Sequence, residues 1–149
     1  MLYPAVSYRL PTSQVLAVAI SDALRENPSV SSQHRLTELV REKLRQLDPD
    51  YMVTEERVRR VAIGSGLARV EVSTRDSGKR KKLSRCPVCG SKLRRVRNRT
   101  ISGGTITLGQ RCTSCPYSMG RTRRIPIRYV FTSTRPRRKD RAEEGQRTL

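Results

Sequence analysis

The chain has 149 residues, with 32 lysines and arginines against 13 aspartates and glutamates, and a formal net charge of +19. Only 35% of its residues are hydrophobic and 4% are aromatic, so the composition favours two small folding units over one large core. No apolar run approaches the roughly 20 residues of a membrane span, and the N-terminus lacks a basic region followed by an apolar one. These features predict a soluble, cytoplasmic protein that has no membrane contact and binds a polyanionic partner.

The front half carries three helical patterns followed by a strand. Each helix begins at a hydroxyl residue that can act as an N-cap, and its apolar residues recur at three- and four-residue spacing. After them, the segment from Leu67 to Thr74 alternates apolar and polar residues, which predicts a half-buried strand. The expected helices run from the Thr12 and Ser13 cap to Asn27, from the Ser31 and Ser32 cap to Asp48, and from Thr54 to Ile63.

Three helices and a strand indicate a helix-turn-helix or winged-helix-like domain over residues 1–76. In one interpretation the third helix enters a major groove of DNA, where Arg57, Arg59 and Arg60 would contact bases or phosphates. In the other, this is a small helical domain that packs on a protein partner, and the arginines are a solvated face. The sequence leaves both interpretations open.

The charge is distributed unequally between the two halves. Residues 1–76 have a net charge of +1 and residues 77–149 a net charge of +18, and no acidic residue occurs between positions 77 and 134. We therefore expect a basic linker at residues 77–85, a second unit at 86–134 and a disordered tail at 135–149.

All four cysteines lie in two C-x2-C pairs, Cys86 with Cys89 and Cys112 with Cys115. Two intervening residues let both thiolates of a pair face one metal while loop N–H groups point at sulfur. The intervening segment is predicted to be a hairpin of strands from Leu93 to Ile101 and from Thr105 to Leu108, which would bring the pairs together. Disulfides, a thioredoxin-like redox pair and an iron–sulfur cluster are the alternatives, and the spacing favours zinc over them.

The two cysteine pairs, the hairpin between them and a further predicted strand from Arg124 to Thr132 resemble the zinc-ribbon family. The resemblance covers about residues 84–132 and implies that Cys86, Cys89, Cys112 and Cys115 hold one structural Zn²⁺. Pro116 departs from the family pattern, in which a glycine often follows the last cysteine. A four-cysteine site has no open position for metal catalysis, and the sole histidine, His34, is expected to be an exposed polar residue. The sequence offers no positive sign of an enzyme.

The second half is dense in cations that could follow a phosphate backbone. On a strand, Arg95, Arg97 and Arg99 would project from one face, and the planar guanidinium suits bidentate phosphate contacts. The candidate nucleic-acid-binding residues are Lys79, Arg80, Lys81, Lys82, Arg94, Arg95, Arg97, Arg99, Arg111, Arg121, Arg123, Arg124 and Arg128.

These observations predict an α+β protein in which a three-helix winged-helix-like domain precedes an antiparallel zinc ribbon. The basic ribbon with flexible arms resembles small zinc-bearing proteins of the ribosome, which implies a ribonucleoprotein role with residues 1–76 facing protein or solvent. The pairing of helix-turn-helix and ribbon also resembles small archaeal-type transcription regulators, which implies DNA binding through the third helix. Because the charge lies outside that helix, RNA is favoured over DNA. A third hypothesis is a protein-interaction adaptor whose ribbon docks on an acidic partner.

Overall fold

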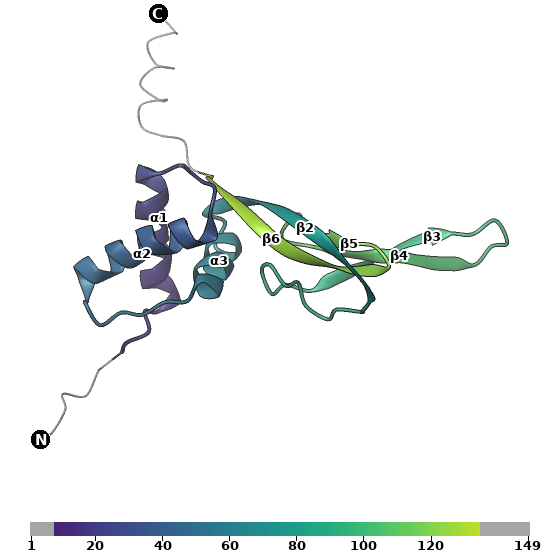
Figure 1. Ribbon diagram of the computed structural model, residues 1–149, viewed down its shortest axis with the longest axis horizontal. Coiled ribbons are helices and arrows are strands. Elements are labelled where there is room, and N and C mark those ends of the chain that lie inside the picture. The colour runs from purple at the N-terminus through teal and green to yellow at the C-terminus, as the bar shows by residue number, and fades with distance from the viewer. Residues whose placement is uncertain (1–7, 135–149) are drawn as a thin grey trace, which may run out of the picture.

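The computed structural model describes residues 8–134, which form a helical body and a long β arm (Figure 1). The predicted tail at 135–149 lies outside the described residues. In chain order the elements are α1 (Ser13–Glu26), β1 (Ser29–Val30), α2 (Gln33–Leu47), α3 (Glu55–Gly64), β2 (Ala68–Arg80), β3 (Leu93–Arg99), β4 (Thr105–Cys112), β5 (Ser118–Met119) and β6 (Thr122–Ser133). The predicted α+β class is confirmed as three helices with two small antiparallel sheets.

The three predicted helices and their N-caps are confirmed. The side chains of Thr12, Ser32 and Thr54 each accept a hydrogen bond from the backbone N–H three residues later. Each such cap satisfies one of the unpaired N–H groups of the first turn and stabilises the helix by about 1 kcal/mol. Local sequence therefore determines where these helices begin.

The core of the helical body is built from the apolar stripes of all three helices and one aromatic residue of the last strand. Leu16 of α1, Leu36 of α2 and Val58 of α3 are fully buried, and so is Phe131 of β6. Phe131 lies opposite Val70 of β2, which is also buried. The helical body thus requires a strand that is distant from it in sequence.

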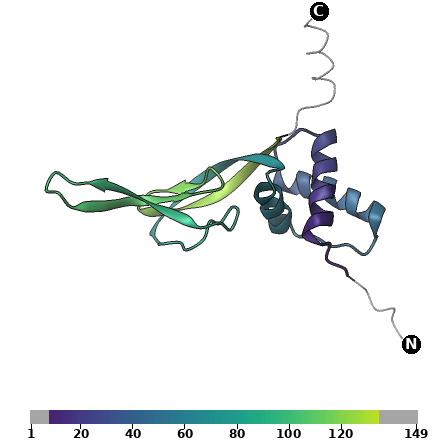
Figure 2. The same cartoon turned by 180° about the vertical axis from the view of Figure 1, so that it is seen from behind.

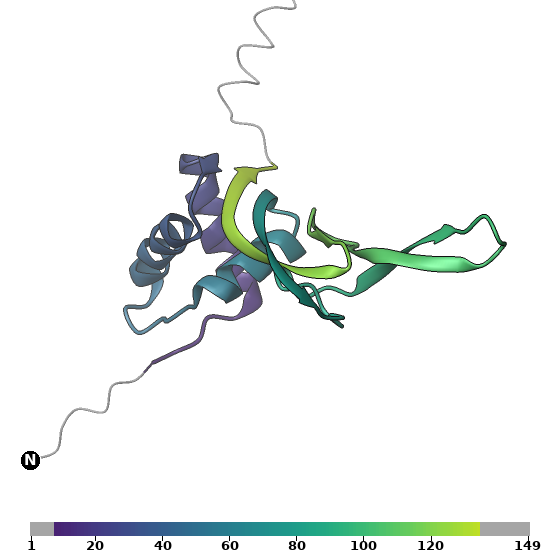
Figure 3. The same cartoon turned by 45° about the vertical axis from the view of Figure 1, so that its right-hand side comes forward.

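The first sheet has the strand order β1-β6-β2 and is antiparallel throughout. Figure 3 shows β2 and β6 side by side next to the helices. The sequence placed the segment 124–132 in the ribbon, as its third strand, and this expectation was wrong. The strand pairs with β2 instead, because in that position its residue Phe131 is completely buried in the core with the helices. The two-residue strand β1, whose Val30 lies opposite Phe131, was not predicted.

The second sheet has the strand order β3-β4-β5 and is inserted in the chain between β2 and β6. The β3–β4 hairpin forms the arm and extends away from the helices when seen from either side (Figures 1 and 2). The pairing of β2 with β6 crosses the expected boundary at residue 76, and residues 77–80 of the expected linker belong to β2. The strand predicted to end at Leu108 continues to Cys112.

Within residues 8–134, no helix combines the length and the apolar character that crossing a membrane requires.

Candidate metal centre and basic groove

The four cysteine sulfurs converge where the base of the arm meets the helical body. Their Sγ atoms all lie within 4.8 Å of one another, with Cys86 and Cys115 separated by 3.5 Å and Cys89 and Cys112 by 3.4 Å. Zinc–sulfur bonds of about 2.3 Å in a tetrahedron place sulfurs about 3.8 Å apart, so a cluster of this size fits a tetrahedral ion. All four thiols are free, and together they could bind a metal such as zinc.

Backbone groups shape each cysteine pair into a loop that faces the cluster. The N–H of Val88 donates to Cys86 Sγ at 3.4 Å, and the N–H of Ser114 donates to Cys112 Sγ at 3.3 Å. The first loop closes through Gly90, whose φ of +79° is a conformation that side-chain-bearing residues rarely adopt. We call residues 86–90 the first knuckle and residues 112–117 the second knuckle.

The electrostatics favour a thiolate within the cluster. The pKa of Cys86 is lowered to about 5, chiefly because the Cys115 thiol donates a hydrogen bond to it, with help from the backbone N–H groups of the first knuckle. The pKa of Cys115 is raised by that same shared proton and by burial. Because thiolates are the form that binds metal, the lowered pKa of Cys86 favours its ligating form.

Arg59 of α3 fixes the first knuckle to the helical body. Its guanidinium donates to the backbone carbonyls of Val88 at 2.6 Å and Pro87 at 3.1 Å, and also to the side chain of Gln33. The same group lies 4.8 Å from the centre of the Tyr129 ring of β6, within cation–π range. Arg59 was predicted to point outward as a candidate DNA-reading residue, but it is 8% exposed and all three of its nitrogens donate hydrogen bonds within the protein.

The other two candidate DNA-reading arginines of α3 also have partners. Arg57 donates to the carbonyl of Pro11 at 2.5 Å, and Arg60 forms an ion pair with Glu56 at 2.7 Å. Arg60 is exposed and Arg57 is half-buried. The helix thus presents one exposed arginine of the three.

Tyr117 fixes the second knuckle to β6. Its ring is 1% exposed, and its hydroxyl donates to the carbonyl of Arg124 at 2.6 Å. Burial is the main cause that raises the pKa of this phenol, so the hydroxyl stays protonated and remains a donor. The two knuckles are therefore attached to different elements of the fold, the first to α3 and the second to β6.

Replacing Tyr117 with phenylalanine should lower the free energy of unfolding by about 1–2 kcal/mol, because the Arg124 carbonyl loses its donor while the ring remains. Chemical denaturation of the metal-loaded protein measures the change. Tyr8→Phe provides the control, since Tyr8 is 67% exposed and should change stability by less than about 0.5 kcal/mol. Equal stabilities of the two variants would contradict the anchoring role.

Basic side chains gather at a groove beside the base of the arm. The groove has a volume of about 470 Å³ and lies between the end of β2, the strand β4 and the segment around β5. Its lining includes no acidic residue. The five cations along it are Arg80, Lys81, Lys82, Arg95 and Arg121.

The remaining predicted cations are spread along the arm and the first sheet. Arg94 and Arg111 are directly opposite one another across β3 and β4, and both are exposed. Like charges in such a pair destabilise a sheet unless an anion binds between them. Lys79, Arg97, Arg99 and Arg124 are exposed, and Arg123 is half-buried. The direct ion pairs found within residues 8–134 all involve residues 9–60, so the described cations of the arm have no such partner.

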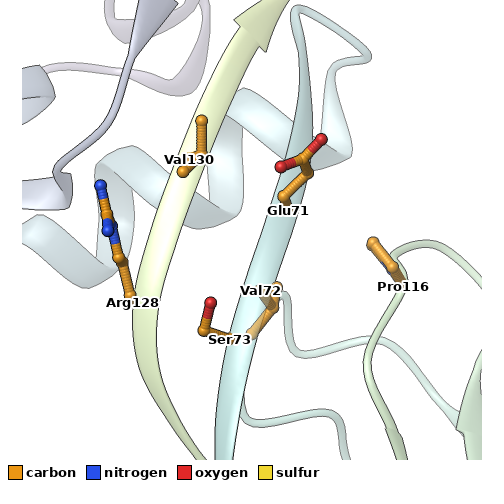
Figure 4. A pocket seen from close by; sticks show the side chains of 6 residues that line it. All are labelled: Glu71, Val72, Ser73, Pro116, Arg128 and Val130. Atoms are coloured by element: carbon orange, nitrogen blue, oxygen red, sulfur yellow. The ribbon is translucent and has the colours of Figure 1, made fainter.

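Arg128 lines a separate cavity of about 530 Å³ between the first sheet and the second knuckle. Figure 4 shows Glu71 and Val72 on β2, Arg128 and Val130 on β6, and Pro116 of the knuckle across from them. This cavity contains a carboxylate, Glu71, and thus differs in charge from the basic groove. Arg128 is therefore not part of the groove.

Sequence reasoning did not identify the role of Arg59, or that of Gln110 in the groove. The amide nitrogen of Gln110 donates to the carbonyl of Leu83 at 2.7 Å, and its oxygen accepts the N–H of Leu83 at 3.0 Å. These bonds attach the segment after β2 to the arm and form the wall of the groove. Gln110 lies beyond the predicted end of that strand at Leu108, so the sequence carried no signal of this contact.

His34 is exposed, as predicted, and lies between two carboxylates. Its ring nitrogens are 3.0 Å from Glu38 and 3.0 Å from Glu55. The hydrogen bond to Glu55 is the main cause that raises the pKa of His34.

Searches with the whole chain found no matching family model, no similar curated protein and no similar solved structure. The function is therefore inferred from the chemistry of the cysteine cluster and the basic groove.

Proposed function

We propose that this protein is a non-enzymatic, zinc-binding protein that holds structured RNA with its basic arm. The single observation that carries this proposal is the groove at the base of the arm, where five cations converge and no carboxylate is present. A phosphate backbone neutralises such a surface, whereas a solvated protein face normally mixes both signs of charge.

The cysteine cluster supports one structural zinc ion. Its four sulfur ligands would fill a tetrahedral shell, so the metal would hold the two knuckles together and leave no position for a substrate. The role of the ion is then mechanical: it would fix the base of the arm to the helical body, to which Arg59 and Tyr117 attach the knuckles. The cluster and the hairpin between its cysteine pairs are consistent with a zinc ribbon.

The helical body supports a winged-helix-like unit. Two helices flank the short strand β1, a third helix follows, and β2 and β6 form the hairpin that would be the wing. In this interpretation the zinc ribbon is inserted into the wing, so the two units share one sheet. Near-neutral charge leaves residues 8–76 available for a protein partner.

RNA is favoured over DNA because the candidate recognition helix is occupied by internal contacts. Arg59 is buried, Arg57 donates to a carbonyl, and Arg60 is paired with Glu56. The exposed cations lie instead on a projecting arm, a shape suited to insertion between RNA helices, as in a ribosome or another ribonucleoprotein of the cytoplasm.

Replacing Arg95, Arg97 and Arg99 together with glutamine should weaken binding to a fully paired RNA hairpin by about tenfold or more. The dependence of log affinity on log salt should become shallower by about 2, because each lost phosphate contact removes about 0.7–0.9 from the slope. Fluorescence anisotropy at several salt concentrations measures both quantities.

The matched control carries the same loss of charge on α1 and α2, with glutamine at Arg25, Arg35 and Arg45, all of them exposed. This variant should keep the wild-type affinity and salt slope. If both triple variants bind the RNA hairpin as tightly as the wild type, the arm does not hold RNA. If the wild type binds a DNA duplex with sequence preference and ignores the RNA, the protein is a DNA-binding regulator instead.

A further inference from the structure

The basic groove has an apolar floor beneath its cationic rim. Ile106 and Leu108 of β4 and Met119 of β5 are among its lining residues, together with the backbone of Gly109 and Gly120. Ile106 is 37% exposed and Leu108 43% exposed. Its volume of about 470 Å³ is within the usual range of small-ligand pockets. A surface that only follows phosphates has no need of such a floor.

The β4 strand is irregular at this point. Val96 is opposite Gly109 and Arg97 is opposite Thr107, which leaves Leu108 as the extra residue of a β-bulge. A bulge changes the direction of side chains and often marks a functional position. Here it accompanies a leucine that lines the groove.

Neighbouring contacts hold the groove in shape. Gln110 makes two hydrogen bonds to the backbone of Leu83, and these fix the wall that carries Lys81 and Lys82. On the other side, a Cβ atom at Gly109 would lie 2.1 Å from the carbonyl oxygen of Met119, so only glycine permits this approach of β4 and β5. The groove is therefore largely formed before any ligand binds.

We propose that this groove accepts an unpaired nucleotide, a bulged or loop residue of the RNA that the arm holds. The inference rests on the proposed function and names the feature of the RNA that is recognised. An extruded base offers an apolar face to Ile106, Leu108 and Met119. The guanidinium planes of Arg95 and Arg121 can stack on it or hold the flanking phosphates. A fully paired helix cannot supply such a base, because its faces are covered by stacking.

The test compares two RNA hairpins that are identical except for one bulged nucleotide. The bulged position carries 2-aminopurine, whose fluorescence responds to its stacking environment. The wild-type protein should bind the bulged hairpin about fivefold or more tightly than the paired one, as expected from one stacked base. The fluorescence should change on binding, and the measurements use the full-length, zinc-loaded chain.

Leu108→Ser should abolish this preference, so that the bulged and the paired hairpin bind with equal affinity. Val96→Ser is the matched control, because Val96 is 40% exposed on the same hairpin but does not line the groove. It should keep the preference. Circular dichroism and zinc content verify that both variants fold.

The outcomes separate this inference from the proposed function. Equal binding of the two hairpins by the wild type, with unchanged 2-aminopurine fluorescence, would overturn the nucleotide site while RNA binding stands. A preference that survives in Leu108→Ser would also overturn it. Failure to bind either RNA overturns both proposals. The same bulge preference on a DNA hairpin, without RNA binding, would support the groove as a nucleotide site and overturn the assignment of RNA.

Discussion

Cys112→Ser is expected to abolish tight zinc binding and to unfold the β3-β4-β5 sheet, while α1, α2 and α3 remain helical. Structural zinc sites contribute about 10–16 kcal/mol of apparent binding free energy, which becomes folding free energy of the segment they join. Cys112 is the last residue of β4 and is 6% exposed, so its loss affects the site and the strand together. The helices persist because their fully buried residues Leu16, Leu36 and Val58, together with Phe131 of β6, belong to a core that does not depend on the metal ligands alone.

Native mass spectrometry measures zinc stoichiometry, and amide hydrogen exchange measures protection element by element. We expect one zinc per chain in the wild type and none in the variant, with protection lost in residues 93–119 and kept in the helices. Thr113→Ser is the control, because it alters the adjacent knuckle residue and keeps a hydroxyl that can donate to the carbonyl of Lys92. A metal-free Cys112→Ser protein with full protection in the arm would contradict the structural role of the metal.

Arg59→Met is expected to lower the free energy of unfolding by about 2–4 kcal/mol. Methionine keeps much of the side-chain volume but provides no donor for the carbonyls of Pro87 and Val88, and unsatisfied buried polar groups cost about 1–3 kcal/mol each. The cation–π contact with Tyr129 is lost as well. Urea denaturation of the zinc-loaded protein measures this loss.

Arg60→Met is the matched control for this experiment. Its side chain is 49% exposed and, among residues 8–134, its ion pair is with the exposed Glu56, so its removal should cost no more than about 0.5 kcal/mol. The comparison also separates anchoring from DNA reading. If Arg59 reads DNA, Arg59→Met should be as stable as Arg60→Met and should lose sequence preference. Equal stability of the two variants would overturn the anchoring role of Arg59.

The sequence predicted well those features that short stretches of chain control. The hydroxyl residues Thr12, Ser32 and Thr54 mark the three helix starts because an N-cap bond spans only three residues. The spacing of the four cysteines predicted a common site because a C-x2-C loop can direct both of its sulfurs to one point. The sequence also indicated that most cations of the arm are exposed, since a long charged side chain is rarely buried without a partner.

Other features were decided only by the tertiary structure. The predicted strand 124–132 was assigned to the ribbon because it follows the last cysteine. It is part of β6, which pairs with β2 although the arm and both cysteine pairs lie between the two strands in the sequence. Pairing over such a distance depends on which core can bury Phe131, and the alternation of apolar residues carries no information about the partner strand.

The arginines of α3 show the same limit at the level of single side chains. The sequence assigned Arg57, Arg59 and Arg60 one common role, but Arg59 is buried because the carbonyls of the first knuckle come within reach of it. The groove likewise joins residues from β2, β3, β4 and β5. Their proximity is created where the segment after β2 is hydrogen-bonded, through Leu83, to Gln110 of β4. By itself, the sequence determined the local elements, the cysteine site and the excess of positive charge. The strand partners, the anchor of the metal site and the place where the charges converge were decided by long-range packing, because a side chain's role depends on the groups that the complete fold brings beside it.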